Sequence, residues 1–339
     1  MKKLWILLLS ALLCVSCQKI DRETPEDPNA VADFEINGLT LKNFPFIDSS
    51  TSTSPLRNMV VYELLGIGYK WQISWISGAD YTLSYEIPDE IIPLSEEHKE
   101  LDRELRNRLL LSNGSHGAFM NLIEGATDVI IDSRDISRNE IQSAQEQDVE
   151  IETKPIAWDA LVFIVNTKNK VKSLTPEQIR KIYTGEITNW KEVGGANHEI
   201  HPYTRNTDSG SQEKMETLVM GGREMKEWPE MMLSSMVSPY NTIEVDEWAI
   251  AYTPYYYCKC MIRDLIKVKI LAVGGVQPNM ETILRGAAGN TRKAYPFYSS
   301  IYAAVRADEP QDTYPRQIYR WLSTPKGKTI INESGYIAL

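Results

Sequence analysis

The sequence predicts an α/β fold, because short apolar runs alternate along the chain with stretches of helical pattern. The chain has 339 residues, of which 42% are hydrophobic and 24% are charged, and these proportions are typical of a globular protein. Only 19 residues are Gly and 17 are Pro, which excludes a collagen-like or low-complexity chain. Strands that alternate with helices indicate a sheet that is mainly parallel.

Six short runs rich in Val, Ile and Leu predict strands, at residues 109–111, 129–131, 161–165, 200–203, 249–252 and 268–272. Helices are expected between them, after turn or cap residues, at 55–65, 117–124, 175–183 and 211–220. The strongly charged stretch 97–106 is expected to form a solvated helix, since opposite charges recur three or four residues apart.

The first residues have the pattern of an export signal. Lys2 and Lys3 precede an apolar run over 4–13, which is too short to span a bilayer comfortably. The run leads to Ser16-Cys17, which resembles a bacterial lipobox, so Cys17 is the expected site of cleavage and lipidation. A plain secretory signal is the alternative. Residues 1–17 are therefore assigned to a lipoprotein signal peptide, and the polar residues 18–37 to a tether between membrane and domain.

The charge balance limits the possible partners. Thirty-six Lys and Arg against 46 Asp and Glu give a net charge of −10, which argues against a general nucleic-acid binder. A site for a small anion remains possible, because a few local donors can override the global charge. Cys258 and Cys260, or His198 and His201, supply too few ligands for a metal site, and neither a metal nor a cofactor is expected.

Four segments share one design, a hydroxyl-rich or glycine-containing turn before an expected helix, at 49–55, 113–117, 132–135 and 205–211. A helix start has unpaired N–H groups and a partial positive charge, so it binds oxyanions without basic side chains. Ser and Thr add hydroxyl donors, and Arg adds a fork that can hold two oxygens. Each turn alone is usually only a helix cap. Four of them in one chain indicate a tetrahedral-oxyanion site.

The stretches 155–166 and 174–190 carry a resemblance to a known family. The second reads LTPEQIRKIYTGEITNW and is close to a signature of the phosphate-binding proteins of ABC transporters. Arg205 and the Ser209-Gly210-Ser211 loop follow at that family's order and spacing. The resemblance runs from about residue 44 to 306.

This resemblance implies a two-lobed type II periplasmic-binding-protein fold, with crossover strands and a ligand cleft between the lobes. The family pattern assigns residues 38–155 and 264–339 to lobe 1, and residues 156–263 to lobe 2. It further implies a monomeric protein that binds inorganic phosphate or a similar oxyanion and serves the membrane subunits of an ABC permease. The protein would stand in the bacterial cell envelope, lipid-anchored to a membrane on its periplasmic or surface face.

The ligand residues follow from the resemblance one at a time. Lobe 2 would supply Arg205, Ser209, Gly210 and Ser211, and lobe 1 would supply Ser52, Thr53, Ser54, Ser115, Ser133 and Arg134. One position departs from the family, because Ser133 stands where many members have a ligand-binding Asp. Discrimination of phosphate from sulfate would then rest on Asp132, Asp208, a backbone carbonyl or a weaker contact.

Two other functions remain open. The chain could be an oxyanion-sensing or adhesive surface lipoprotein with the same fold. It could also be a serine-dependent phosphatase, for which Ser115 with the adjacent His116 is the best candidate pair. Adjacent residues at a helix start rarely point together, and the sequence has no G-x-S-x-G elbow, so the prediction is that the protein is not an enzyme.

Overall fold

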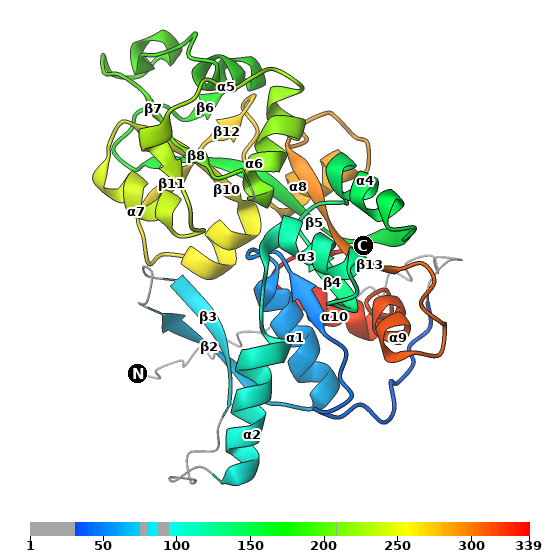
Figure 1. Cartoon of the computed structure of the whole chain (residues 1–339). Helices are drawn as coiled ribbons and strands as arrows, with labels where there is room; N and C mark the ends of the chain where they lie inside the picture. The colour runs from blue at the N-terminus through cyan, green and yellow to red at the C-terminus, as the bar shows by residue number, and fades with distance from the viewer. Residues whose placement is uncertain (1–30, 75–79, 87–94, 208) are drawn as a thin grey trace, which may run out of the picture. The chain divides into compact units, whose positions relative to one another are not determined.

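The computed structural model describes residues 31–74, 80–86, 95–207 and 209–339 (Figure 1). Cys17 and the rest of the predicted signal peptide lie outside these residues, and so does Asp208. None of the helices in the described ranges is long and apolar enough to cross a membrane.

The main sheet of the described residues has eight strands. Its central path runs β1 (Ile47–Ser49), β4 (Val129–Asp132), β13 (Tyr298–Arg306), β5 (Ile151–Asn166), β10 (Ala249–Pro254) and β7 (His201–Pro202). Two further strands, β11 (Val268–Ile270) and β14 (Ile337–Ala338), also pair with β5. The smaller sheets pair β2 (Tyr69–Ser74) with β3 (Asp80–Tyr85), β6 (Ser173–Leu174) with β12 (Ala272–Val273), and β8 (Thr204–Arg205) with β9 (Met232–Leu233).

The main sheet is mixed, and the expectation of a mainly parallel sheet was wrong. β1 with β4 and β10 with β7 are parallel pairs, whereas β13 lies antiparallel to both β4 and β5. The long strand β5 explains the difference. It pairs with β13 through its first part and with β10 through its last part, both antiparallel, so one strand joins two groups of neighbours.

Helices cover the sheet. They are α1 (Ser54–Leu65), α2 (Glu96–Glu104), α3 (Gly114–Ile123), α4 (Arg138–Glu146), α5 (Pro176–Tyr183), α6 (Gly210–Lys214), α7 (Ser238–Val245), α8 (Met280–Ala287), α9 (Tyr314–Trp321) and α10 (Pro325–Ser334). π-helical turns form η1 (Leu105–Leu109), η3 (Met215–Met220) and η5 (Tyr257–Ile262), and 3₁₀ turns form η2 (Trp190–Val193) and η4 (Pro229–Met231). All five predicted helices are confirmed, at α1, α2, α3, α5 and α6 with η3.

Most predicted strands are confirmed, but the one at 109–111 was wrong. Leu109 ends η1, where Leu105 and Leu109 lie four residues apart and bury the same side of the turn. The chain after the turn is held by a buried cation instead of a neighbouring strand. The guanidinium of Arg57 donates to the carbonyl oxygens of Leu110 (2.8 Å) and Ile47 (2.9 Å), and also to that of Leu111. An apolar triplet alone could not distinguish these two structures.

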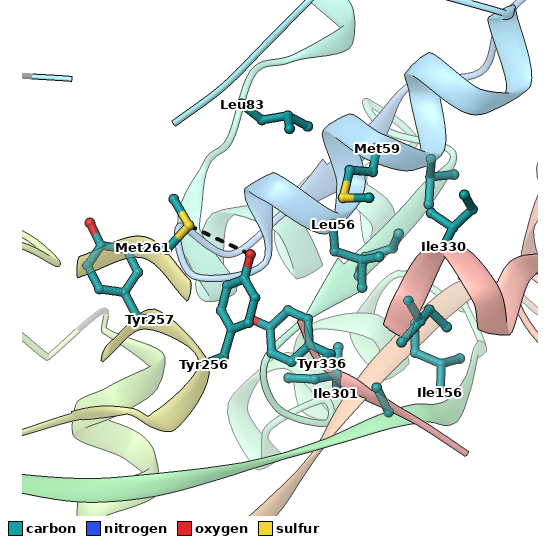
Figure 2. Close-up of a cluster of buried hydrophobic side chains, with 14 of the residues drawn as sticks. Leu56, Met59, Leu83, Ile156, Tyr256, Tyr257, Met261, Ile301, Ile330 and Tyr336 are labelled. Carbon is teal, nitrogen blue, oxygen red and sulfur yellow. Dashed lines mark hydrogen bonds between the residues drawn. The ribbon is translucent and has the colours of Figure 1, made fainter. Parts of the chain in front are cut away.

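A large hydrophobic cluster joins distant parts of the chain (Figure 2). α1 and α10, from near the two ends of the described chain, lie side by side (Figure 1). Below them the rings of Tyr256 and Tyr336 stack with centroids 3.9 Å apart, and Tyr336 donates to the carbonyl of Ser52 (2.9 Å). This contact ties the turn before α1, which carries predicted site residues, to the C-terminal segment.

Candidate functional site

A cavity of about 290 Å³ lies where the predicted turns meet. Its lining is Ser50, Thr51, Ser52, Ser112, Asn113, Gly114, Ser115, Ser133, Arg205, Asn206, Ser209, Gly210, Ser211, Ser234 and Met236. The lining therefore consists of hydroxyls, amides, exposed backbone, one guanidinium and the thioether of Met236. Among the described residues it contains no carboxylate.

Of the ten residues predicted to bind phosphate, the structure places seven on this cavity: Ser52, Ser115, Ser133, Arg205, Ser209, Gly210 and Ser211. Thr53, Ser54 and Arg134 do not line it. Thr53 Oγ1 donates to the carbonyl of Ile131 (2.6 Å), and Ser54 Oγ donates to the carbonyl of Ser50 (3.1 Å). The Thr53 hydroxyl holds the turn before α1 against the end of β4, and the Ser54 hydroxyl closes the turn itself.

The start of α3 is fixed to the sheet by a buried carboxylate. Asp48 on β1 accepts from the backbone N–H of Asn113 (3.0 Å) and from the side-chain amides of Asn113 (2.6 Å) and Asn121 (3.0 Å). Gly114 follows with φ of +73°, a conformation that favours glycine. The next residue, Ser115, is thereby placed on the cavity, at the first turn of the helix.

Ser115 is joined to a carboxylate behind the cavity. Its hydroxyl donates to Asp132 Oδ1 over 2.8 Å, and the backbone N–H of Arg134 donates to the same oxygen (3.2 Å). Asp132 is fully buried, and its other oxygen has no hydrogen-bond partner in the part of the chain that is described. Burial raises the pKa of Asp132 from 3.8 to about 6, although Arg134 and Lys214 act in the opposite direction.

Arg205 brings the positive charge. It lies on β8, and its backbone N–H is held by the Tyr252 hydroxyl (3.0 Å) and the Gln212 side chain (3.1 Å). Its Nε donates to the carbonyl of Leu233 (3.0 Å), and its Nη1 contacts Met236 Sδ (3.3 Å), a weak acceptor. Among the described residues, the groups that act electrostatically on this guanidinium are the hydroxyls of Tyr252, Tyr257 and Tyr240, and no carboxylate is among them. Arg205 is buried, which lowers its pKa and makes an uncompensated charge costly.

Gly210 begins α6 in close contact with two of the hydroxyls. A Cβ at this position would lie 2.7 Å from Ser133 Oγ and 2.9 Å from Ser115 Oγ, so only glycine fits without a shift. Lys214, one turn later, is buried, and its Nζ has no hydrogen-bond partner among the described residues. Burial lowers the pKa of Lys214, while Asp159, Asp132 and Glu213 oppose that effect.

Arg134 contacts carboxylates outside the cavity. Its two Nη atoms donate to the two carboxylate oxygens of Glu140 (2.8 and 2.7 Å), and its Nε pairs with Glu213 Oε2. His116 Nδ1 contacts the same Glu140 (3.0 Å), and these residues line a separate hollow of about 440 Å³. Burial would lower the pKa of Arg134, but the surrounding carboxylates outweigh it and raise the pKa.

The sequence missed a few lining residues. Ser112, Ser234 and Met236 lie outside the four predicted turns, and nothing in the local pattern marks them. Ser112 donates to the carbonyl of Ser49 (2.7 Å), which places it beside the turn before α1. The other lining residues all fall within the predicted turns.

Comparisons with known proteins show which family the chain resembles. A sequence model described as a PBP superfamily domain matches residues 103–312. The phosphate-binding protein PstS of Borreliella burgdorferi is 26% identical over 242 residues, which cover 67% of this chain and 77% of the relative. The phosphate-binding protein PstS of Staphylococcus haemolyticus is 26% identical over 230 residues, which cover 66% of this chain and 70% of the relative.

Solved structures show the same architecture. The crystal structure of an ABC-type phosphate transport receptor from Vibrio cholerae matches with a TM-score of 0.58 at 21% identity, over 86% of this chain and 99% of the other. The crystal structure of PstS from Borrelia burgdorferi matches with a TM-score of 0.51 at 20% identity, over 87% and 98%. At such identities the likeness shows the fold, and the expected type II periplasmic-binding-protein fold is confirmed.

Proposed function

Since the chain belongs to the PBP superfamily, we propose that it captures inorganic phosphate outside the cytoplasm and delivers it to the membrane subunits of an ABC permease. The observation that carries this proposal is the cavity, in which hydroxyls and helix-start amides surround the buried Arg205, a cation that pairs with no carboxylate of the described residues. The sequence similarity to phosphate-binding proteins of two bacteria supports it.

Phosphate fits the chemistry of the lining. Arg205 supplies one full charge, and Ser52, Ser115, Ser133, Ser209 and Ser211 supply hydroxyls. The start of α3, at Gly114 and Ser115, adds partial positive charge beside the cavity, and Gly210 lets the chain approach a ligand closely. Neutral donors of this kind bind an anion without making a protein of net charge −10 locally basic.

The remaining predicted site residues support the cavity from outside. Thr53 and Ser54 hold the turn before α1, and Arg134 links the loop after β4 to α6 through Glu213. Under the predicted division into lobe 1 (38–155 and 264–339) and lobe 2 (156–263), donors from both lobes would surround one ion. Closure of the lobes about the ion would then shield it from water.

The proposed cellular location rests on the predicted signal peptide and tether. Lipidation of Cys17 would anchor the chain to the outer side of a membrane, and acyl chains contribute about 0.8 kcal/mol per buried CH₂. The tether would let the binding domain reach a permease in the same membrane. The proposed protein is a monomer that needs no cofactor.

Binding is favoured over catalysis by the position of His116. A phosphatase that used Ser115 would need a base within hydrogen-bond reach. His116 instead contacts Glu140 and lines the neighbouring hollow with Arg134, while the Ser115 hydroxyl is held by Asp132. We therefore propose that the bound ion leaves chemically unchanged.

The proposal is tested by isothermal titration calorimetry on the full chain in detergent, after bound ligand has been removed. Phosphate is expected to bind at micromolar or lower concentration, with one ion per chain. A matched titration with sulfate, and turnover of a generic phosphate ester, should both give no signal. Absence of heat with phosphate would overturn the proposal and favour the sensory or adhesive function.

A further inference from the structure

The cavity needs a group that can distinguish protonated phosphate from unprotonated sulfate. Monohydrogen phosphate carries a proton that it can donate, whereas sulfate carries none at neutral pH, so a group that can only accept discriminates between them. A carboxylate would be such a group, but the described lining contains none. A serine hydroxyl normally adapts to either ion, because it can donate or accept.

Ser115 differs from an ordinary serine because its proton is already used. The hydroxyl donates to Asp132 Oδ1 over 2.8 Å, and only 2% of Ser115 is exposed, so water does not compete for that proton. Only the lone pairs of Ser115 Oγ are then available to a ligand. Ser133 Oγ, close to the same point beside Gly210, has no hydrogen-bond partner among the described residues and stays adaptable.

Asp132 is fixed in this role by its surroundings. The backbone N–H of Arg134 donates to the same oxygen that Ser115 uses, which pins the orientation of the carboxylate. The cations that face Asp132 are Arg134 from its own loop and Lys214 from α6. Both favour the ionised form, and an ionised carboxylate has no proton to return to Ser115.

We propose that Asp132 determines the specificity of the site as a positioning residue, by holding the Ser115 proton so that Ser115 Oγ accepts a hydrogen bond from a protonated tetrahedral oxyanion. The inference rests on the proposed capture of phosphate and adds the group that recognises its proton. Asp132 itself does not touch the ion. The carboxylate lies one residue before Ser133, and it acts through Ser115.

The test compares four anions on the full chain by calorimetry at mildly alkaline pH. Phosphate and arsenate carry a proton there, whereas sulfate and selenate do not. Ser115→Ala should reduce the ratio of phosphate to sulfate affinity by about tenfold, because one hydrogen bond made only by the protonated ion is lost. Asp132→Leu should reduce that ratio at least as much, because Ser115 can then donate into the cavity. In each variant the affinity for arsenate should change as the affinity for phosphate does, and the affinity for selenate should change as the affinity for sulfate does.

Asp132→Asn is the matched control. Its amide oxygen can still accept from Ser115 and from the Arg134 N–H, so the ratio should stay within about threefold of the wild type. In the Asp132→Leu/Ser115→Ala double variant the ratio should fall no further than in Ser115→Ala alone, because Asp132 acts through Ser115. If Asp132→Leu does not fold, Asp132→Ala takes its place, because it too removes the acceptor of the Ser115 proton.

Two results would overturn the inference, and they are distinguishable. If the wild type binds phosphate selectively and Ser115→Ala leaves the ratio unchanged, the proposed function stands and the role of Asp132 falls. If the wild type binds no phosphate at all, both fall together. Removal of the negative charge of Asp132 would raise the affinity for all four dianions alike. The ratio of phosphate to sulfate affinity does not respond to that general effect.

Discussion

Arg134 donates two nearly equal hydrogen bonds to Glu140, from its two Nη atoms to the two carboxylate oxygens, at 2.8 and 2.7 Å. The Glu140 side chain is completely buried, and that of Arg134 is 9% exposed. Glu140 also accepts from the backbone N–H of Ser137 (2.9 Å), so it closes the N-terminus of α4. The loop after β4, which carries Ser133, is thereby held in place by a buried ion pair.

Removal of Arg134 should therefore cost stability. Arg134→Met leaves the Glu140 carboxylate buried without its partner, and such a loss typically costs about 3–5 kcal/mol. The free energy of unfolding, measured by urea denaturation without phosphate, should fall by about that amount. Arg285→Met is the control, because Arg285 and Glu281 form an exposed pair on α8 and its loss should cost no more than about 1 kcal/mol. Equal effects of the two variants would contradict this role of the buried pair.

Gly210 leads to a second prediction. In Gly210→Ala the new methyl group would lie 2.7 Å from Ser133 Oγ and 2.9 Å from Ser115 Oγ, so either these hydroxyls or the start of α6 must move from their positions at the cavity. Phosphate affinity should fall by more than about tenfold, because the hydroxyls and Arg205 no longer converge on one ion. Calorimetry measures the loss, and circular dichroism should show an intact fold.

A second substitution tests the cause of that loss. Ser133→Gly in the Gly210→Ala background removes the closer of the two contacts and should recover part of the affinity. If the double variant binds no better than Gly210→Ala, the steric explanation is wrong.

Arg205 should supply most of the charge that the ion meets. Arg205→Ala should weaken phosphate binding by well over tenfold, since truncation of one partner in a buried charge pair costs about 2–5 kcal/mol. Arg223→Ala is the matched control, because Arg223 pairs with Glu177 on the exposed surface and does not line the cavity. Phosphate titrations of both variants decide the point, and similar affinities for the two would exclude Arg205 from the site.

The sequence predicted most of the cavity because local chemistry encodes it. A hydroxyl or glycine before a helix start is visible in a short window, and the four predicted turns contain every lining residue except Ser112, Ser234 and Met236. The contacts behind the cavity lining could not be predicted from the sequence. Whether Arg134 faces the cavity or Glu140, and whether Asp132 binds Ser115, depends on how β4, α3 and α4 pack together.

The sheet was harder to predict for a similar reason. Apolar runs located β4, β5 and β10, but the direction in which strands pair depends on contacts far apart in sequence, such as Tyr302 opposite Asp132. β13 was missed because Tyr, Ser and Arg interrupt its apolar pattern. The triplet at 109–111 was read as a strand, since no local signal shows that Arg57, more than fifty residues earlier, binds its carbonyl groups.

The buried carboxylate behind Ser115 predicts a pH dependence of stability. Burial raises the pKa of Asp132 from 3.8 to about 6 against the pull of Arg134 and Lys214, so between these values the folded chain binds more protons at Asp132 than the unfolded chain. Asp132 therefore lowers the stability increasingly as the pH rises toward 6, and its cost is complete above that value. Asp132→Asn removes the ionised form, so the variant's free energy of unfolding relative to the wild type should rise from acidic to neutral pH. Urea denaturation across this range measures the difference. A difference for Asp132→Asn that stays constant with pH would show that Asp132 titrates alike in the folded and unfolded chains.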